Sequence, residues 1–139
     1  MFHLKIKDVK ATIERIKAML AAKPFDSVYF VACGGSRATM NPGKYILERE
    51  TDKVTVDIYT ANEFVHTPPK RFTKNSVVVL TSYSGTTAET VEACRIAKEK
   101  GARPIAFSMF PEKAIGIADE VVFYEDEPSN PPPTFLTIF

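Results

Sequence analysis

The stretch Ser76–Thr90 reads SVVVLTSYSGTTAET, and this stretch decides the fold of the chain. Its first part, 77–80, is an apolar run typical of a strand buried on both faces of a parallel sheet. A turn of small polar residues, 82–87, follows, and a helical pattern begins directly after it. A buried strand that leads through such a turn into a helix N-terminus is a common anion site in α/β proteins. The stretch therefore predicts an α/β fold with a phosphate-binding turn.

A second unit of the same kind lies upstream. Ser27–Cys33 reads SVYFVAC, a continuous β-branched, aromatic and apolar run, and it opens into Gly34-Gly35-Ser36. A helix is expected from about Ser36 to Glu50, with a kink or a delayed start because Pro42 lies near its beginning. Its inner face is expected to carry Ala38, Tyr45, Ile46 and Leu47.

Strands and helices alternate along the rest of the chain. Further strands are expected at 54–59, 75–81, 103–108 and 120–124, and further helices at 9–23, 61–64, 86–100 and 111–117. The alternation predicts a three-layer α/β sandwich, with a five-stranded parallel sheet of flavodoxin-like order 2-1-3-4-5 and right-handed crossovers. Residues 1–125 would form this one domain, with 1–7 as an arm or lead-in.

The ends of two helices carry recognisable signals. Asp8 is a plausible N-cap for the first helix, and apolar residues then recur at helical spacing. These residues are Val9, Ile13, Ile16 and Leu20. Gly101 follows the 86–100 helix, where a C-terminal glycine is expected.

Composition narrows the classes of protein. The 139 residues suffice for one domain, and 18 basic against 17 acidic residues give a net charge of +1. This balance disfavours nucleic-acid and membrane-surface binders, which show a basic face. Cys33 and Cys94 are expected to be buried single thiols, because two cysteines make no disulfide framework. No secretory pattern or apolar run of about 20 residues is visible, so the cytoplasm is the expected location.

The predicted sheet order brings the two turns together. The first and third strands would be neighbours whose connections leave in opposite directions, and ligands bind at such a switch point. Ser82, Ser84, Thr86 and Thr87 around Gly85 offer hydroxyl and backbone donors to a phosphate, and the first turn offers more. A single turn of this type is more often only a helix cap, but two at one switch point favour a ligand site. Neither turn has the Walker A or dinucleotide spacing, so no nucleotide cofactor is expected, and no metal site.

The two motifs together resemble the sugar isomerase (SIS) domain family. Cys33-Gly34-Gly35-Ser36 resembles its Cys-Gly-x-Ser turn, and Ser82-Tyr83-Ser84-Gly85-Thr86-Thr87 its Ser-x-Ser-Gly-x-Thr turn. The resemblance covers about Ser27 to Tyr124. It is strongest to fructosamine-6-phosphate deglycases and to the isomerase half of glutamine–fructose-6-phosphate aminotransferase.

The resemblance implies a role for each site residue. Ser82, Ser84 and Thr87 would hold the phosphate of a hexose 6-phosphate or its amine adduct, helped by the backbone N–H of Tyr83. Gly35 and Ser36 would face the sugar from the other side. Glu63 is a further substrate contact or, equally, an exposed helix charge.

The catalytic step does not carry over from the resemblance. The family's deglycases and aminotransferases usually place their acid/base glutamate and histidine in a second SIS domain, and His3 and His66 match no such role. The catalytic residues are therefore unknown. Residues 126–139 are expected to form an acidic Pro-rich linker and an apolar tail. The tail would either dock on this or another subunit or be the start of that second domain.

Three functions stay open. The first is the N-terminal half of a deglycase or of an aldose–ketose isomerase or aminotransferase. The second is a sugar-phosphate sensor without catalysis, and the third a single-domain isomerase completed across a subunit interface. The resemblance also implies a homodimer or higher homo-oligomer, with the first helix and Phe135–Phe139 as contact surfaces.

Overall fold

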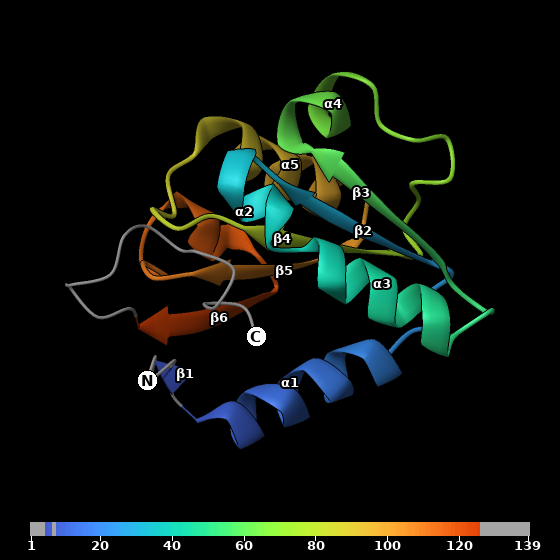
Figure 1. Ribbon diagram of the computed structural model, residues 1–139, viewed down its shortest axis with the longest axis horizontal. Helices are drawn as coiled ribbons and strands as arrows, with labels where there is room; N and C mark the ends of the chain where they lie inside the picture. The colour runs from blue at the N-terminus through green and yellow to red at the C-terminus, as the bar shows by residue number, and fades with distance from the viewer. Residues whose placement is uncertain (1–4, 7, 126–139) are drawn as a thin grey trace.

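A single six-stranded sheet forms the centre of the molecule, flanked by helices on both faces (Figure 1). The computed structural model describes residues 5–6 and 8–125. The sheet order is β1-β6-β5-β4-β2-β3. The strands are β1 (Lys5–Ile6), β2 (Ser27–Ala32), β3 (Thr55–Thr60), β4 (Ser76–Thr81), β5 (Arg103–Ser108) and β6 (Glu120–Glu125).

The five strands from β2 to β6 are parallel and confirm the predicted order 2-1-3-4-5. The short β1 was not predicted. Within the segment expected to be an arm or lead-in, Lys5 and Ile6 pair antiparallel with Glu125 and Tyr124 of β6. Two residues are too short to show a strand pattern in sequence.

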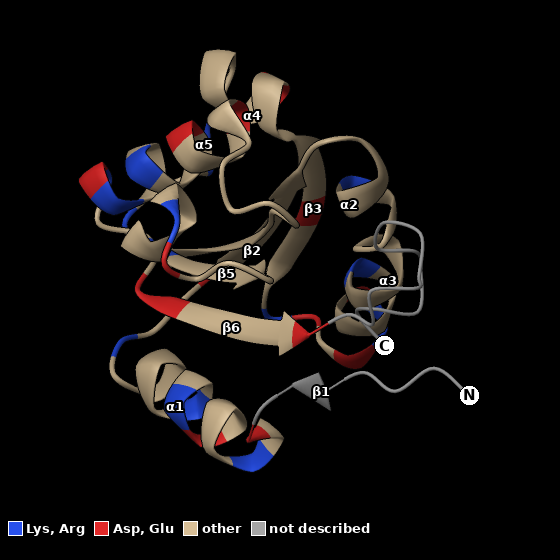
Figure 2. Ribbon diagram, turned by 90° about the vertical axis from the view of Figure 1, so that its left-hand side faces the viewer, with Lys and Arg blue, Asp and Glu red and all other residues tan. Residues whose placement is uncertain are grey.

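Helices cover the two faces of the sheet unequally. They are α1 (Val9–Ala21), α2 (Gly34–Ala38), α3 (Asn41–Glu50), α4 (Ala61–His66), α5 (Ala88–Glu99) and the 3₁₀ turn η1 (Ala114–Ile117). One core cluster joins α4, α5 and η1 to one face, whereas α1 and α3 pack on the other. Figure 2 shows the two layers on opposite sides of the strands, with both signs of charge on α1 and on α5.

Successive side chains of β2 point to opposite faces of the sheet and so contribute to both core clusters. All six of its residues are buried. Tyr29 and Val31 belong to the cluster under α4 and α5, whereas Val28 and Phe30 belong to the cluster under α1 and α3. A strand buried on both faces is typically a near-continuous apolar run, and β2 shows this pattern after the buried Ser27 at its start.

The expected helix 36–50 is in fact two helices. α2 ends at Ala38, and α3 starts at Asn41 with Pro42 in its first turn, a position that suits proline because no N–H is needed there. The inner face was also predicted wrongly in part. Ala38, Tyr45 and Ile46 are exposed, whereas Leu47 faces the sheet as predicted, together with Met40 and Gly43.

α1 is capped as predicted but only half covered. The Asp8 carboxylate accepts a hydrogen bond from the Ala11 backbone N–H at 3.2 Å. Ile16 and Leu20 pack on the sheet, but Val9 and Ile13 are about half exposed, so the predicted inner face fails in the first two turns. In the part of the chain that the structure describes, no helix is long and apolar enough to cross a membrane.

Candidate phosphosugar site

The two predicted turns lie side by side at the carboxyl edge of the sheet. β2 and β4 are neighbours, and Ala32 at the end of β2 pairs with Thr81 at the end of β4. Cys33 and Ser82 therefore start their turns from adjacent positions. Because the crossover from β2 runs to β3 and that from β4 to β5, the chain leaves these two strands in opposite directions, which defines the switch point.

The turn 82–87 is held mainly by its own hydroxyls. The Ser82 backbone N–H donates to Phe107 O at 3.0 Å, and its hydroxyl donates to Thr87 Oγ1 at 3.3 Å. Ser84 Oγ accepts from the Thr86 N–H at 3.2 Å and from the Thr86 hydroxyl at 3.0 Å. Within this turn the hydroxyls thus form two pairs, Ser82 with Thr87 and Ser84 with Thr86.

Gly85 shapes this turn through its backbone. Its φ is 69°, and a Cβ at this position would lie 2.8 Å from the Phe110 carbonyl oxygen. Its own carbonyl accepts from the Ile115 N–H at 3.0 Å. The 108–115 loop therefore braces the turn from behind, a contact that the sequence did not reveal because the two segments are far apart along the chain.

The N-terminus of α5 follows this turn directly. The first N–H groups of a helix have no intrahelical acceptor, and Thr87, the N-cap of α5, does not satisfy them with its side chain. Donors left in this way, together with the helix dipole, are suited to an anion. The first helical turn of α5 also carries Glu89, whose side chain is exposed.

The turn 34–36, which follows β2, leaves room for a ligand. A Cβ added to Gly34 or Gly35 would meet nothing within 4 Å, so open space lies above this backbone. Ser36, the third predicted residue here, is half-buried, and its carbonyl accepts from the Thr39 hydroxyl at 2.7 Å. The Thr90 hydroxyl of α5 reaches Cys33 Sγ at 3.8 Å and ties the two turns together.

Glu63 lies at the same edge but serves a structural purpose. One of its carboxylate oxygens accepts from the Thr60 N–H at 2.9 Å and from the Thr60 hydroxyl at 2.7 Å, a capping box that starts α4. The Thr60 hydroxyl and backbone bonds lower the pKa of this carboxyl, and the positive charge of Arg37 lowers it further. Glu63 is thus ionised at neutral pH and close to α2.

An acid/base pair is not assembled over the two turns in the described residues. His66 is exposed in the last turn of α4, and Glu63 is held in its cap. Tyr83 is half-buried, and its ring meets that of Phe110 edge to face, with 6.4 Å between the ring centroids. Within 5–6 and 8–125, no cluster of three metal-ligating side chains occurs.

Comparison with known proteins agrees with this geometry. The family model described as SIS domain matches residues 20–134. The fructosamine deglycase FrlB of Bacillus subtilis is 42% identical over 109 residues, which is 78% of this chain and 32% of the deglycase. A glutamine–fructose-6-phosphate aminotransferase of Clostridium acetobutylicum is 33% identical over 121 residues, 87% of this chain and 19% of that enzyme.

A solved structure supports the same assignment. A Salmonella typhimurium LT2 protein with a provisional phosphosugar isomerase name superposes with a TM-score of 0.84 at 35% identity. The match covers 99% of this chain and 43% of that one, so this chain spans less than half the length of these relatives. With the paired turns, the sheet order and the matched family model in agreement, the chain belongs to the SIS domain family.

Proposed function

We propose that this chain is the phosphosugar-binding SIS domain of a fructosamine-6-phosphate deglycase or a related aldose–ketose isomerase. The observation that carries the proposal is the pairing of the open glycine turn 34–36 with the hydroxyl-rich turn 82–87 at the switch point between β2 and β4. Ser82, Ser84, Thr87 and the Tyr83 N–H would bind the phosphate, and Gly35 and Ser36 would face the sugar. The 42% identity to a fructosamine deglycase favours an amine adduct of a hexose 6-phosphate as the ligand.

The phosphate anchor would serve the chemistry from a distance. Binding energy from a non-reacting phosphate can orient C1 and C2 of the sugar toward an acid/base pair. The described residues do not assemble that pair, so in a longer protein it would come from another domain or another subunit. This arrangement would make the present chain the N-terminal, ligand-holding half of the enzyme.

Calorimetric titration tests the anchor. Fructose 6-phosphate should bind the parent chain, and Ser84→Ala should weaken binding about tenfold or more, because a hydroxyl contact to a charged phosphate is lost. Thr55→Ala is the matched control, since Thr55 is exposed at the opposite edge of the sheet. Absence of binding, or equal affinity of Ser84→Ala and the parent, would refute the anchor.

The sensor alternative rests on the exposed His66 and the capped Glu63. A sugar-phosphate sensor would bind the same ligand without converting it. In a longer protein that contains this chain together with the part that would supply the acid/base pair, incubation with a fructosamine 6-phosphate, followed by detection of free amine, separates the two functions. Binding together with amine release would support the enzyme, whereas binding without release would support the sensor.

A further inference from the structure

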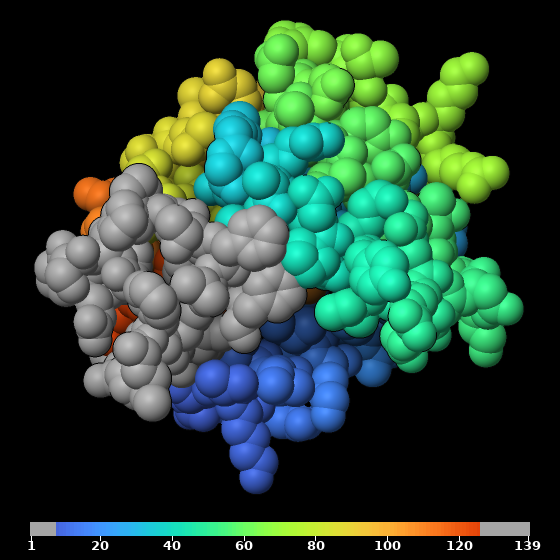
Figure 3. Space-filling view, in the orientation of Figure 1, coloured from blue at the N-terminus to red at the C-terminus, as the bar shows by residue number. Residues whose placement is uncertain are grey.

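The face of the sheet under α1 and α3 contains a groove that these two helices do not fill. The groove has a volume of about 340 Å³. Its walls and floor are almost wholly apolar and include Ile16, Leu20, Met40, Leu47, Val79 and Phe107. In Figure 3 the two helices lie one below the other on the same side of the molecule, so the groove is a feature of that side.

The groove is unusual for a sheet face in a folded domain. Protein interiors contain few voids larger than a water molecule, and an apolar surface of this kind is normally covered. The opposite face shows the contrast, because α4, α5 and η1 together cover it with one continuous core cluster. The α1–α3 face therefore lacks one covering element among the described residues.

The groove also contains one buried hydroxyl, which indicates that a group filling the groove would not be purely apolar. Thr81 lines the groove and is only 2% exposed, yet its Oγ1 has no hydrogen-bond partner in the described part of the chain. A buried hydroxyl without a partner is unfavourable, and native structures rarely keep one. The occupant should thus be apolar with a hydrogen-bonding group where the groove meets the carboxyl edge of the sheet.

We propose that residues 134–139 of this chain occupy the α1–α3 groove. Their sequence, TFLTIF, combines four large apolar side chains with two threonine hydroxyls three residues apart. The segment thus offers apolar surface together with hydroxyl groups that can donate or accept a hydrogen bond. This composition matches an apolar groove that contains one unpaired hydroxyl.

The connection is long enough for this docking. β6 ends at Glu125, on the same carboxyl edge of the sheet as Thr81, because β4, β5 and β6 are parallel. β4 lies two strands from β6, which corresponds to about 10 Å. The ten residues from Glu125 to Phe135 can span up to about 33 Å. A short tether also gives a high effective concentration, which favours docking on the same molecule over docking on another copy.

A tryptophan introduced into the tail reports the docking directly, because the chain has no tryptophan of its own. In the 139-residue chain with Phe135→Trp, the emission maximum should lie well to the blue of the same protein in urea, and iodide should quench it weakly. Adding Leu47→Glu, a charge in the groove wall, should shift the emission to the red. Ile46→Glu is the matched control, since Ile46 is the next residue of α3 but 52% exposed.

Each other outcome overturns the proposal. Emission equal to that in urea would mean that the segment lies in water. A blue shift unaffected by Leu47→Glu would place the segment elsewhere on the molecule, provided that circular dichroism shows the variant folded. A blue shift that disappears on dilution would mean that the segment docks on a second copy. None of these results depends on sugar binding, so the proposed function is tested separately.

Discussion

Gly85 is the residue on which the shape of the phosphate turn depends. Its φ of 69° costs a residue with a side chain about 1–2 kcal/mol. A Cβ would also lie 2.8 Å from the Phe110 carbonyl oxygen, a backbone atom that cannot rotate away. We expect Gly85→Ala to lower the free energy of unfolding by about 3 kcal/mol or more in urea titrations, and to abolish fructose 6-phosphate binding.

Gly101→Ala is the matched control for this change. Gly101 has a φ of 77°, but a Cβ there would make only an ordinary contact of 3.5 Å with Lys74. We expect it to cost about 1–2 kcal/mol, from the backbone alone, and to leave binding intact. Equal losses in the two variants would show that the close approach to Phe110 does not matter.

Cys94 should make the protein less stable in alkali. Burial raises the pKa of its thiol to about 12 in the folded state, against 9.0 for a free thiol. The unfolded chain therefore releases this proton first, so stability is retained below about pH 9 and falls as the pH rises toward 12. Urea titrations at about pH 8 and about pH 10.5 should show this fall.

Replacement of the thiol tests its share of the pH dependence. In Cys94→Ala the difference in stability between the two pH values should shrink, although burial raises the pKa of Tyr29 and Tyr59 in the same direction and part of the difference will persist. Cys33→Ala serves as the control for a cysteine removed from a half-buried position. An unchanged difference in Cys94→Ala would contradict the assignment.

Some features of the candidate site are visible in one short stretch of sequence, whereas others depend on contacts between residues far apart in the chain. The hydroxyls of Ser82, Ser84 and Thr87 could be predicted, because one turn of sequence contains them all. The contact of Thr90 with Cys33 joins residues 57 apart, and the brace on Gly85 comes from a loop beyond β5. Such contacts depend on the fold, so a reading of local pattern cannot reach them.

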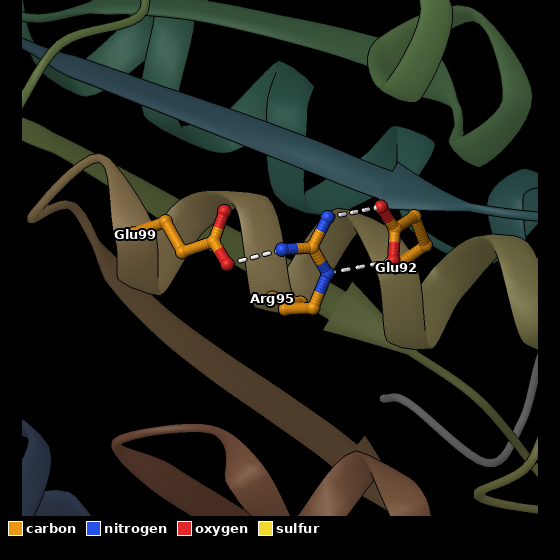
Figure 4. Close-up of polar contacts among 3 residues, drawn as sticks. All are labelled: Glu92, Arg95 and Glu99. Atoms are coloured by element: carbon orange, nitrogen blue, oxygen red, sulfur yellow. Dashed lines mark hydrogen bonds and ion pairs between the residues drawn. The ribbon is translucent and has the colours of Figure 1, made fainter.

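At the scale of elements, two arginines differ sharply in what they hold together. Arg103 at the start of β5 is 7% exposed and donates to three backbone carbonyls near the end of α1, at 3.0–3.2 Å. Its guanidinium also lies 5.4 Å from the centre of the Phe25 ring. Arg95 lies on the outer side of α5 and pairs with Glu92 and Glu99 of the same helix (Figure 4).

The same substitution should therefore have different effects at the two positions. Arg103→Met would leave buried carbonyls without donors and should cost about 2–4 kcal/mol of unfolding free energy. Arg95→Met should change stability little, because ion pairs on an exposed helix face contribute little and are screened by salt. Chemical denaturation of both variants checks this contrast, and similar losses would refute it.

Elements were predictable where the sequence repeats one simple pattern. The apolar runs of β2 and β4 predicted buried parallel strands, and the strict alternation predicted the sheet order. The inner face of α3 was not predictable, because Gly43 faces the sheet beneath the ring of Phe30 and carries no apolar side chain to mark it. The exposed Tyr45 and Ile46 imitate an inner face by their composition alone.

For the whole molecule, ligand binding should appear as added stability. A ligand at one hundred times its dissociation constant stabilises the folded state by about 2.7 kcal/mol. Fructose 6-phosphate should therefore raise the melting temperature by several degrees, and fructose at the same concentration should not, because the anchor recognises the phosphate. An equal effect of both sugars would argue that the turns do not bind the phosphate.

The predicted homo-oligomer is tested at the same scale. Light scattering should give at least twice the mass of 15.5 kDa expected for one chain. A mass of one chain at all concentrations would contradict the prediction.

The two-residue β1 has a consequence for how copies of this sheet could join. By pairing with Tyr124 and Glu125 it covers the last two residues of β6 at one edge of the sheet, and very short edge strands are poor templates for a further chain. At the other margin β3 pairs only with β2 among the described strands. Backbone hydrogen bonds between molecules could then form along only one edge of the sheet in each molecule. A chain of molecules needs two, so such bonding would stop at a closed pair and could not propagate into a fibre.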